Sequence, residues 1–93
     1  MSEEIDSKIF RKALVEYPYI HDSTGAYIHH ITKVNAFQNE DGVHVIIETH
    51  RPGILIGAKG TQITGIRNYM SKKLGQDITI EIIESQLFQN LYS

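Results

Sequence analysis

The sequence has no cysteine and no tryptophan, and it contains only two prolines. The absence of cysteine excludes a disulfide framework, a thiolate metal site and a cysteine nucleophile, and it agrees with a reducing compartment. No apolar run approaches the length of about 18 residues that a transmembrane helix needs. The first residues, MSEEIDSK, are acidic and lack an apolar stretch, so we expect no signal peptide. We therefore predict a cytoplasmic protein that has no membrane partner.

The composition is that of an ordinary folded domain. Of the 93 residues, 41% are hydrophobic and 22% are charged, which is unlike the composition of disordered chains. A chain of this size buries about 60–65% of its unfolded surface, which is enough for one small core. We therefore expect a single domain over residues 1–93.

Charge is distributed unevenly along the chain. Between Thr49 and Gln76 there is no Asp or Glu, and five Lys and Arg residues give this segment a charge of +5. The other residues carry four cations and eleven acids, or −7, so that the whole chain has a charge of −2. A basic segment inside an acidic chain can attract anions, because the local field matters more than the net charge. The alternative is a solvated helix face that has no ligand.

The first half of the chain predicts a helix and a hairpin. Apolar residues at helical spacing predict a helix over residues 3–17, with Ser2 as its N-cap and an end imposed by Pro18. Strands are expected over residues 27–38 and 43–50, joined by an Asp-Gly turn at residues 39–42. One face of the first strand would carry Ile28, His30, Thr32, Val34 and Ala36, and one face of the second would carry Val43, Val45 and Ile47.

The second half predicts two helices and a strand. Pro52 suits the first position of a short helix that includes residues 54–56 and stops at Gly57. A second helix is expected over residues 61–74, ended by Gly75, and residues 78–84 alternate as a strand does. Residues 85–93 have helical spacing but are too few for an independent helix. The buried face of the long helix would carry Ile63, Ile66, Met70 and Leu74.

This order of elements predicts an α/β fold of the form α-β-β-α-α-β. The hairpin makes the first two strands antiparallel, whereas the helical crossover before the last strand permits parallel pairing with a right-handed connection. We expect a three-stranded mixed sheet with the helices packed on one face.

The segment ILIGAKGTQI, residues 54–63, contains the most informative motif. Gly57 and Gly60 lie three residues apart between the two expected helices, and Lys59 adds a cation between them. Glycine permits a positive φ and close approach of another backbone, and N–H groups at a helix start attract anions. The combination suits a phosphodiester backbone. A tight turn between helices, without a ligand, is the alternative.

In this context the chain resembles the KH family, in its type II arrangement, over about residues 27–84 and most specifically over residues 51–63. The segment THRPGILIGAKG, residues 49–60, is most similar to the KH domain of a bacterial small-subunit ribosomal protein. The resemblance implies one KH domain, in which residues 1–18 add an N-terminal helix, residues 27–84 form the hairpin and core, and residues 85–93 form a tail. It also implies that the loop between the core helices clamps the backbone of about four single-stranded nucleotides.

The resemblance assigns roles to particular residues. The clamp would consist of Gly57, Ala58, Lys59 and Gly60. Ile56 and Ile63, with Ile54, would form an apolar floor beneath the bases. The strand around Thr79 and Ile80, as far as Ile82, would form the opposite wall, and its backbone can bond base edges. Arg51 and Arg67, with Lys72 and Lys73, are the candidates for surrounding phosphates, although spacing alone leaves open which of them face the groove.

The implied partner is single-stranded RNA, with single-stranded DNA as an alternative, and a ribosome or a protein is a further candidate partner. We expect no catalysis and no cofactor, because the serines lack a local base motif and the glycine spacing is not that of a P-loop. We also expect no metal site, because the adjacent His29 and His30 would point to opposite faces of a strand. The competing interpretation is a protein-interaction module whose fold has lost affinity for nucleic acid. The sequence leaves the oligomeric state open.

Overall fold

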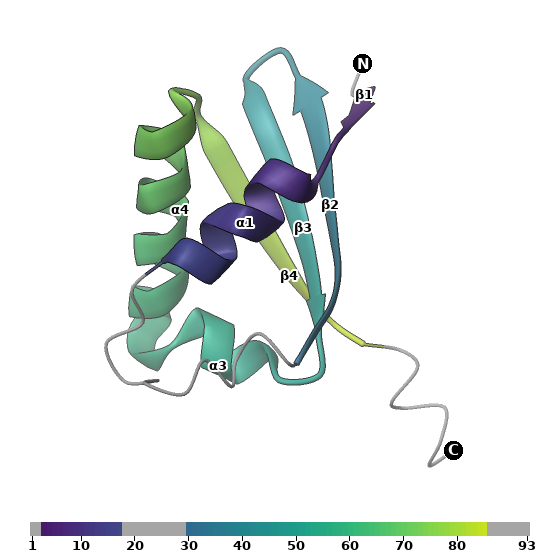
Figure 1. The fold of residues 1–93 in the computed structure, drawn as a ribbon. Coiled ribbons are helices and arrows are strands. Elements are labelled where there is room, and N and C mark those ends of the chain that lie inside the picture. Colours follow the sequence, from purple (N-terminus) through teal and green to yellow (C-terminus); the bar gives the residue numbers. More distant parts are fainter. Residues whose placement is uncertain (1–2, 18–29, 86–93) are drawn as a thin grey trace.

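The computed structural model describes residues 3–17 and 30–85, which form two layers (Figure 1). The first, which we call the sheet layer, contains β1 (Glu3–Ile5), β2 (Ile31–Asn39), β3 (Gly42–Thr49) and β4 (Ile78–Glu84), side by side in that order. The second, the helical layer, contains α1 (Lys8–Glu16), α3 (Pro52–Ile56), the 3-10 turn η1 (Ala58–Gly60) and α4 (Thr61–Leu74). The predicted mixed α/β architecture is confirmed.

The N-terminal segment differs from the prediction. Residues 3–5 form a strand that pairs antiparallel with the end of β2, so that Ile5 lies opposite Ala36 and packs against the core. The helix begins only at Lys8, whose backbone N–H donates to the Asp6 carboxylate over 3.0 Å. The helix predicted from residue 3 is therefore too long, and the sheet has four strands rather than three. Ser2, the predicted N-cap, lies outside the described residues.

The β2–β3 hairpin is confirmed, with one irregularity that the sequence pattern does not predict. The register between the strands shifts between Ile31 and Lys33, so that Ile31 is buried and Thr32 is exposed. Thr32 was expected on the face of Val34, but its hydroxyl instead hydrogen-bonds to the Glu48 carboxylate over 2.9 Å. Such a bulge adds one residue to the strand, so the side chains before it point to the opposite face of the sheet from the one that simple alternation predicts. Residues 27–29 of the predicted strand lie outside the described residues.

The second half of the chain follows the prediction closely. α4 and β4 have the predicted bounds, and Pro52 begins α3. The connection through α3 and α4 makes β4 parallel to β3, as expected of a helical crossover. Gly75 ends α4 in the left-handed conformation with φ 66°, which glycine adopts without steric cost.

One hydrophobic core joins the two layers. Ile66 and Met70 of α4 are fully buried, as predicted, whereas Ile63 and Leu74 are half-buried. The helices bury their apolar residues against one face of the sheet, where Val43, Val45 and Ile47 of β3 lie as predicted. The core consists of Phe10, Ala13, Leu14, Ile31, Val34, Ala36, Val43, Val45, Ile47, Leu55, Ile66, Met70 and Ile78.

Candidate functional site

The connection between α3 and α4 has a specific backbone conformation. Gly57 has φ 74° and ψ 175°, Lys59 has φ 56°, and Gly60 has φ 75°. A Cβ atom on Gly57 would lie 2.6 Å from Cβ and 2.9 Å from the backbone nitrogen of Gln62, which is closer than atoms can approach. Lys59 is the single non-glycine residue with a positive φ in residues 3–17 and 30–85. The loop therefore needs glycine at position 57 and holds Lys59 in an uncommon conformation.

Internal hydrogen bonds fix this loop. The Gly57 N–H donates to the Gly53 carbonyl over 3.0 Å, and the Gly60 N–H donates to the Gly57 carbonyl over 3.2 Å. The Thr61 N–H donates to the Ala58 carbonyl. Ala58 and Lys59 are exposed between these bonds. The result is a hydrogen-bonded tip at the start of α4 that presents one cation to solvent.

The apolar residues expected beneath the bases flank this tip. Leu55 is buried and anchors α3, whereas Ile54 and Ile56 are 40% and 38% exposed. Ile54 and Ile56 therefore offer apolar surface to solvent in the helix that precedes the loop. Ile63, one turn into α4, is half-buried.

The basic residues of α4 divide between two sides of the helix. Gly60, Ile63, Arg67 and Ser71 follow one another at intervals of three or four residues and so share one side. Ser71 donates a 2.8 Å hydrogen bond to the carbonyl of Gln76, which leads into β4, so this side faces β4. The structure thus brings the exposed Arg67 to the side of the loop and of Ile63.

Lys73 lies on the other side of α4. Its ammonium forms an ion pair with Glu16 of α1 and lies 5.6 Å from the centre of the Tyr69 ring. Tyr69 in turn packs edge-on against Tyr17, with ring centroids 5.6 Å apart. Lys73 therefore joins α4 to α1 and is not brought to the loop. Lys72, next to it, is exposed.

β4 separates the two wall residues that the sequence grouped together. Ile80 packs against the core on the helix side, as does Ile82, whereas Thr79 is exposed and its side chain lies on the opposite face. The alternation of a strand causes this separation. β4 is the last strand of the sheet, and within the described residues it pairs with β3 alone. Thr79 can therefore reach the helix side only through its backbone groups at the free edge.

Arg51 lies beyond the opposite end of α3 from Gly57. Arg51 is exposed, and its backbone N–H donates to the hydroxyl of the buried Thr49 over 3.1 Å. This hydrogen bond lies between the end of β3 at Thr49 and the start of α3 at Pro52. Arg51 is therefore held at the start of α3 rather than at the loop.

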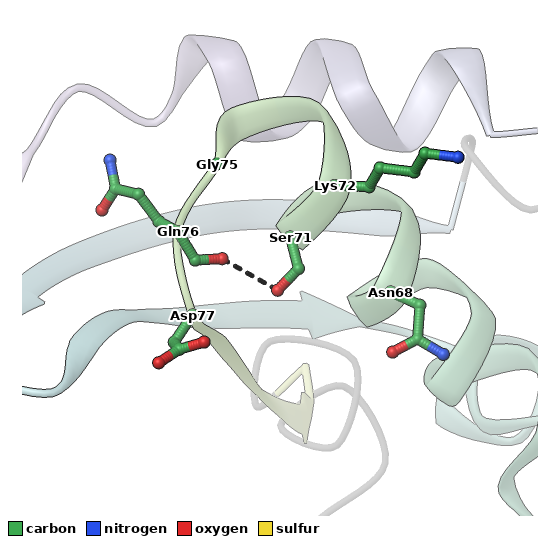
Figure 2. A pocket seen from close by; sticks show the side chains of 6 residues that line it. All are labelled: Asn68, Ser71, Lys72, Gly75, Gln76 and Asp77. Carbon is green, nitrogen blue, oxygen red and sulfur yellow. Dashed lines mark hydrogen bonds between the residues drawn. The ribbon is translucent and has the colours of Figure 1, made fainter.

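Sequence reasoning missed a polar depression at the far end of α4, which Figure 2 shows. Its volume is about 520 Å³. A helix of 14 residues is about 21 Å long, so this depression and the loop occupy opposite ends of one helix. The stop at Gly75 was the available signal, since the turn after it brings Gln76 and Asp77 beside the last turn of α4. The residues that line it are Asn68, Ser71, Lys72, Gly75, Gln76 and Asp77.

Other kinds of site find no support in the described part of the chain. No group of three or more His, Asp or Glu side chains lies close enough together there to hold a metal ion. Within residues 3–17 and 30–85 there is also no helix long and apolar enough to cross a membrane. His44 contacts Glu81 over 3.1 Å on the outer face of the sheet, away from the loop.

Comparison with known proteins identifies relatives of this segment. Residues 20–86 match a family model described as "KH domain". The small ribosomal subunit protein uS3 of Salinispora tropica is 43% identical over 54 residues, which are 58% of this chain and 19% of that protein. The uS3 of Paenarthrobacter aurescens is 39% identical over 62 residues, which are 67% of this chain and 23% of that protein. The chain thus matches about a fifth of the length of these relatives.

Proposed function

This chain belongs to the KH domain family, and we propose that it is a type II KH domain that binds single-stranded RNA through the loop at residues 57–60 without catalysing a reaction. The domain would include all 93 residues. Single-stranded DNA is the alternative ligand, because a backbone clamp does not by itself recognise the ribose 2′-hydroxyl.

The conformation of the loop is the observation that carries this proposal. Positive φ at residues 57, 59 and 60 turns the chain sharply at the start of α4, and the exposed tip presents Lys59 beside the positive end of that helix. A phosphodiester fits such a tip, because backbone N–H groups and a nearby cation both stabilise negative charge.

The neighbouring residues supply what the bases need. Ile54 and Ile56 form an exposed apolar floor, Ile63 continues it, and Arg67 follows on the same side of α4. We assign the opposite wall to the free edge of β4, where Ile80 contributes its side chain and Thr79 its backbone. Arg51 contacts phosphates that leave the groove at the start of α3.

The ribosomal relatives suggest where such binding takes place. A protein that shares this domain with uS3 is expected to associate with ribosomal RNA or ribosomal proteins in the cytoplasm. Binding to a ribosome is testable by co-sedimentation with small subunits, and it requires the RNA contact described above to be intact.

The direct test replaces Ala58 and Lys59 by Asp together. Asp tolerates the left-handed conformation of residue 59, so the loop keeps its shape while two negative charges replace one positive charge. Repulsion of each phosphate costs about 1 kcal/mol or more, so we expect the affinity for single-stranded RNA to fall at least about tenfold, measured by fluorescence anisotropy.

Substitution of the same two residues by Asn is the matched control. Asn has nearly the shape of Asp but no charge, so it removes only the contact made by Lys59, and we expect a loss of about threefold. Equal RNA affinities for the wild type and the Asp variant would exclude the loop as the binding site.

A protein-interaction module is the second candidate function, and the outer face of the sheet favours it. That face carries Ile83, which is 39% exposed and lies diagonal to half-buried Ile46 of the neighbouring strand. If this is the function, RNA affinity is weak in the wild type and the Asp variant does not change it. Substitution of Ile83 by Lys then abolishes capture of the partner while the loop variants retain it.

A further inference from the structure

A second basic surface lies on α1, which is outside the residues that match the KH family model. Lys8, Arg11 and Lys12 are all exposed. They lie at helical spacing on one side of α1, directly opposite the side that Phe10 and Leu14 bury against the sheet. We call these three cations the α1 basic stripe. It faces away from the sheet layer, over which α1 passes in Figure 1.

Among the residues that the structure describes, no ion pair neutralises the charge of the α1 basic stripe. The one acidic residue within α1 is Glu16, and it forms an ion pair with Lys73 of α4. Within residues 3–17 and 30–85, no ion pair involves any of the three stripe residues. The stripe therefore presents a charge of about +3 to solvent, which a polyanion can complement.

The contact between α1 and α4 is made by the C-terminal end of α1, and the stripe lies five to nine residues before Tyr17 along that helix. Tyr17 packs against Tyr69, and its hydroxyl lies against Gly65, so α1 adjoins the side of α4 that faces away from Arg67. Packed helix axes are about 8–10 Å apart, so a strand clamped on the Arg67 side must pass over α4 to reach the stripe.

We propose that the α1 basic stripe is a second RNA-binding surface, which contacts the phosphate backbone of the RNA that flanks the nucleotides held in the groove. This inference rests on the proposed function, because the groove is what brings the flanking RNA to α1. Within residues 3–17 and 30–85 the cation that lies over an aromatic ring is Lys73 and not a residue of the stripe, so the stripe would bind phosphates and contribute affinity rather than sequence preference.

The length of the RNA separates the two surfaces experimentally. A randomised RNA tetranucleotide fills only the groove, whereas a randomised RNA of about 20 nucleotides reaches both surfaces. The variant replaces Lys8, Arg11 and Lys12 by Gln, which has a similar helix propensity and is placed at exposed positions, so the fold is retained. Circular dichroism verifies this before binding is measured.

Three lost phosphate contacts should change the slope of log K against log salt by about 2, because each contributes about 0.7 for single strands. At about 0.1 M salt we expect the long RNA to bind at least about fivefold more weakly to the triple variant, and the tetranucleotide to bind with unchanged affinity, within about twofold. An unchanged salt slope for the long RNA, or an equal loss for both RNAs, overturns the proposal.

Two further variants serve as matched controls. Lys8→Arg together with Lys12→Arg keeps the charge and should keep the wild-type slope. Lys33→Gln removes one exposed cation from the sheet layer and should change the slope less than Arg11→Gln does. Equal effects of these two single substitutions would show that net charge, and not the stripe, determines binding.

Failure of the groove is distinguishable from failure of the stripe. If the Ala58→Asp, Lys59→Asp variant binds the tetranucleotide like the wild type, the proposed function is wrong. The triple Gln variant then still decides, through the long RNA alone, whether α1 contacts phosphates.

Discussion

The helical layer carries seven Lys and Arg residues and one Glu, whereas the four strands of the sheet layer carry one Lys and five Glu. The corresponding charges are +6 and −4, in a chain whose net charge is only −2. A net charge near zero therefore results here from two opposite faces rather than from an even mixture. An anion that approaches the helices meets a positive field, and the same anion is repelled from the outer face of the sheet.

The two layers also use their polar groups differently. On the outer face of the sheet, Glu4 accepts a 2.9 Å hydrogen bond from Asn35, and Glu81 contacts His44, so side chains there partner one another across strands. In the helical layer, Glu16 and Lys73 form the ion pair and the other cations are exposed. Several carboxylates of the sheet layer thus have polar partners across strands, whereas Lys73 is the one cation of the helical layer that forms an ion pair within the described residues.

The largest expected effect tests what attaches the two layers to each other. Ile66 is 1% exposed and lies between α4 and the sheet. Replacing it by Ala removes buried methyl groups and leaves a cavity, which should lower the free energy of unfolding by about 2–4 kcal/mol. Urea denaturation followed by circular dichroism measures this loss.

Lys72→Ala is the control for Ile66→Ala, because Lys72 lies on the same helix and is exposed. We expect it to change the stability by less than about 0.5 kcal/mol. Similar small losses for both substitutions would mean that α4 is rotated relative to the structure and that its cations face the core.

A smaller effect tests the loop that links α3 to α4. Gly57→Ala forces a Cβ atom against Gln62 in a backbone of positive φ, and we expect it to destabilise the fold by about 1–3 kcal/mol. Gly60→Ala shares the positive φ but meets no atom within 4 Å, so its cost should be about 1 kcal/mol. Thermal unfolding of the two variants compares them, and an equal cost would show that the close approach of Gln62 is not required.

The elements with strong local signals could be predicted from the sequence. Gly75 stops α4 at the predicted residue, and the alternation of residues 78–84 gives the bounds of β4. β1 could not be predicted, because three residues are too few to show a period and their stability as a strand depends on the edge of β2. The displacement of Thr32 depends on a bulge, which is a property of strand pairing and leaves no trace in the local pattern.

The candidate site was predictable in part for the same reason. The loop at residues 57–60 is contiguous in sequence, so its glycines and Lys59 could be recognised together. The wall at Thr79 and Ile80 is predicted through the backbone of the strand and stays a prediction, whereas the alternation of the strand places their two side chains on opposite faces. The α1 basic stripe is separated in sequence from the basic residues 49–76, and α1 meets their helix only in the folded chain, through the packing of Tyr17 on Tyr69 and the ion pair of Glu16 with Lys73.

The smallest expected effect decides whether local field or net charge governs RNA binding. Glu16→Gln and Glu81→Gln each remove one negative charge, the first from the helical layer and the second from the outer face of the sheet. Glu81 points to the outer face of the sheet, away from the helices, whereas Glu16 lies within the helical layer, so screening at 0.1 M salt, where the Debye length is about 10 Å, should weaken the effect of Glu81 on bound RNA more than that of Glu16.

Glu16→Gln also releases Lys73 from its ion pair and so adds a free cation near the α1 basic stripe. We therefore expect Glu16→Gln to raise the affinity for an RNA of about 20 nucleotides two- to threefold, and Glu81→Gln to raise it by less than about 1.5-fold. Fluorescence anisotropy at about 0.1 M salt resolves this difference, and repeating it near 0.01 M, where the Debye length is about 30 Å, should bring the two variants closer together. Equal gains at the higher salt would mean that the opposite charges of the two layers do not direct RNA to the helices.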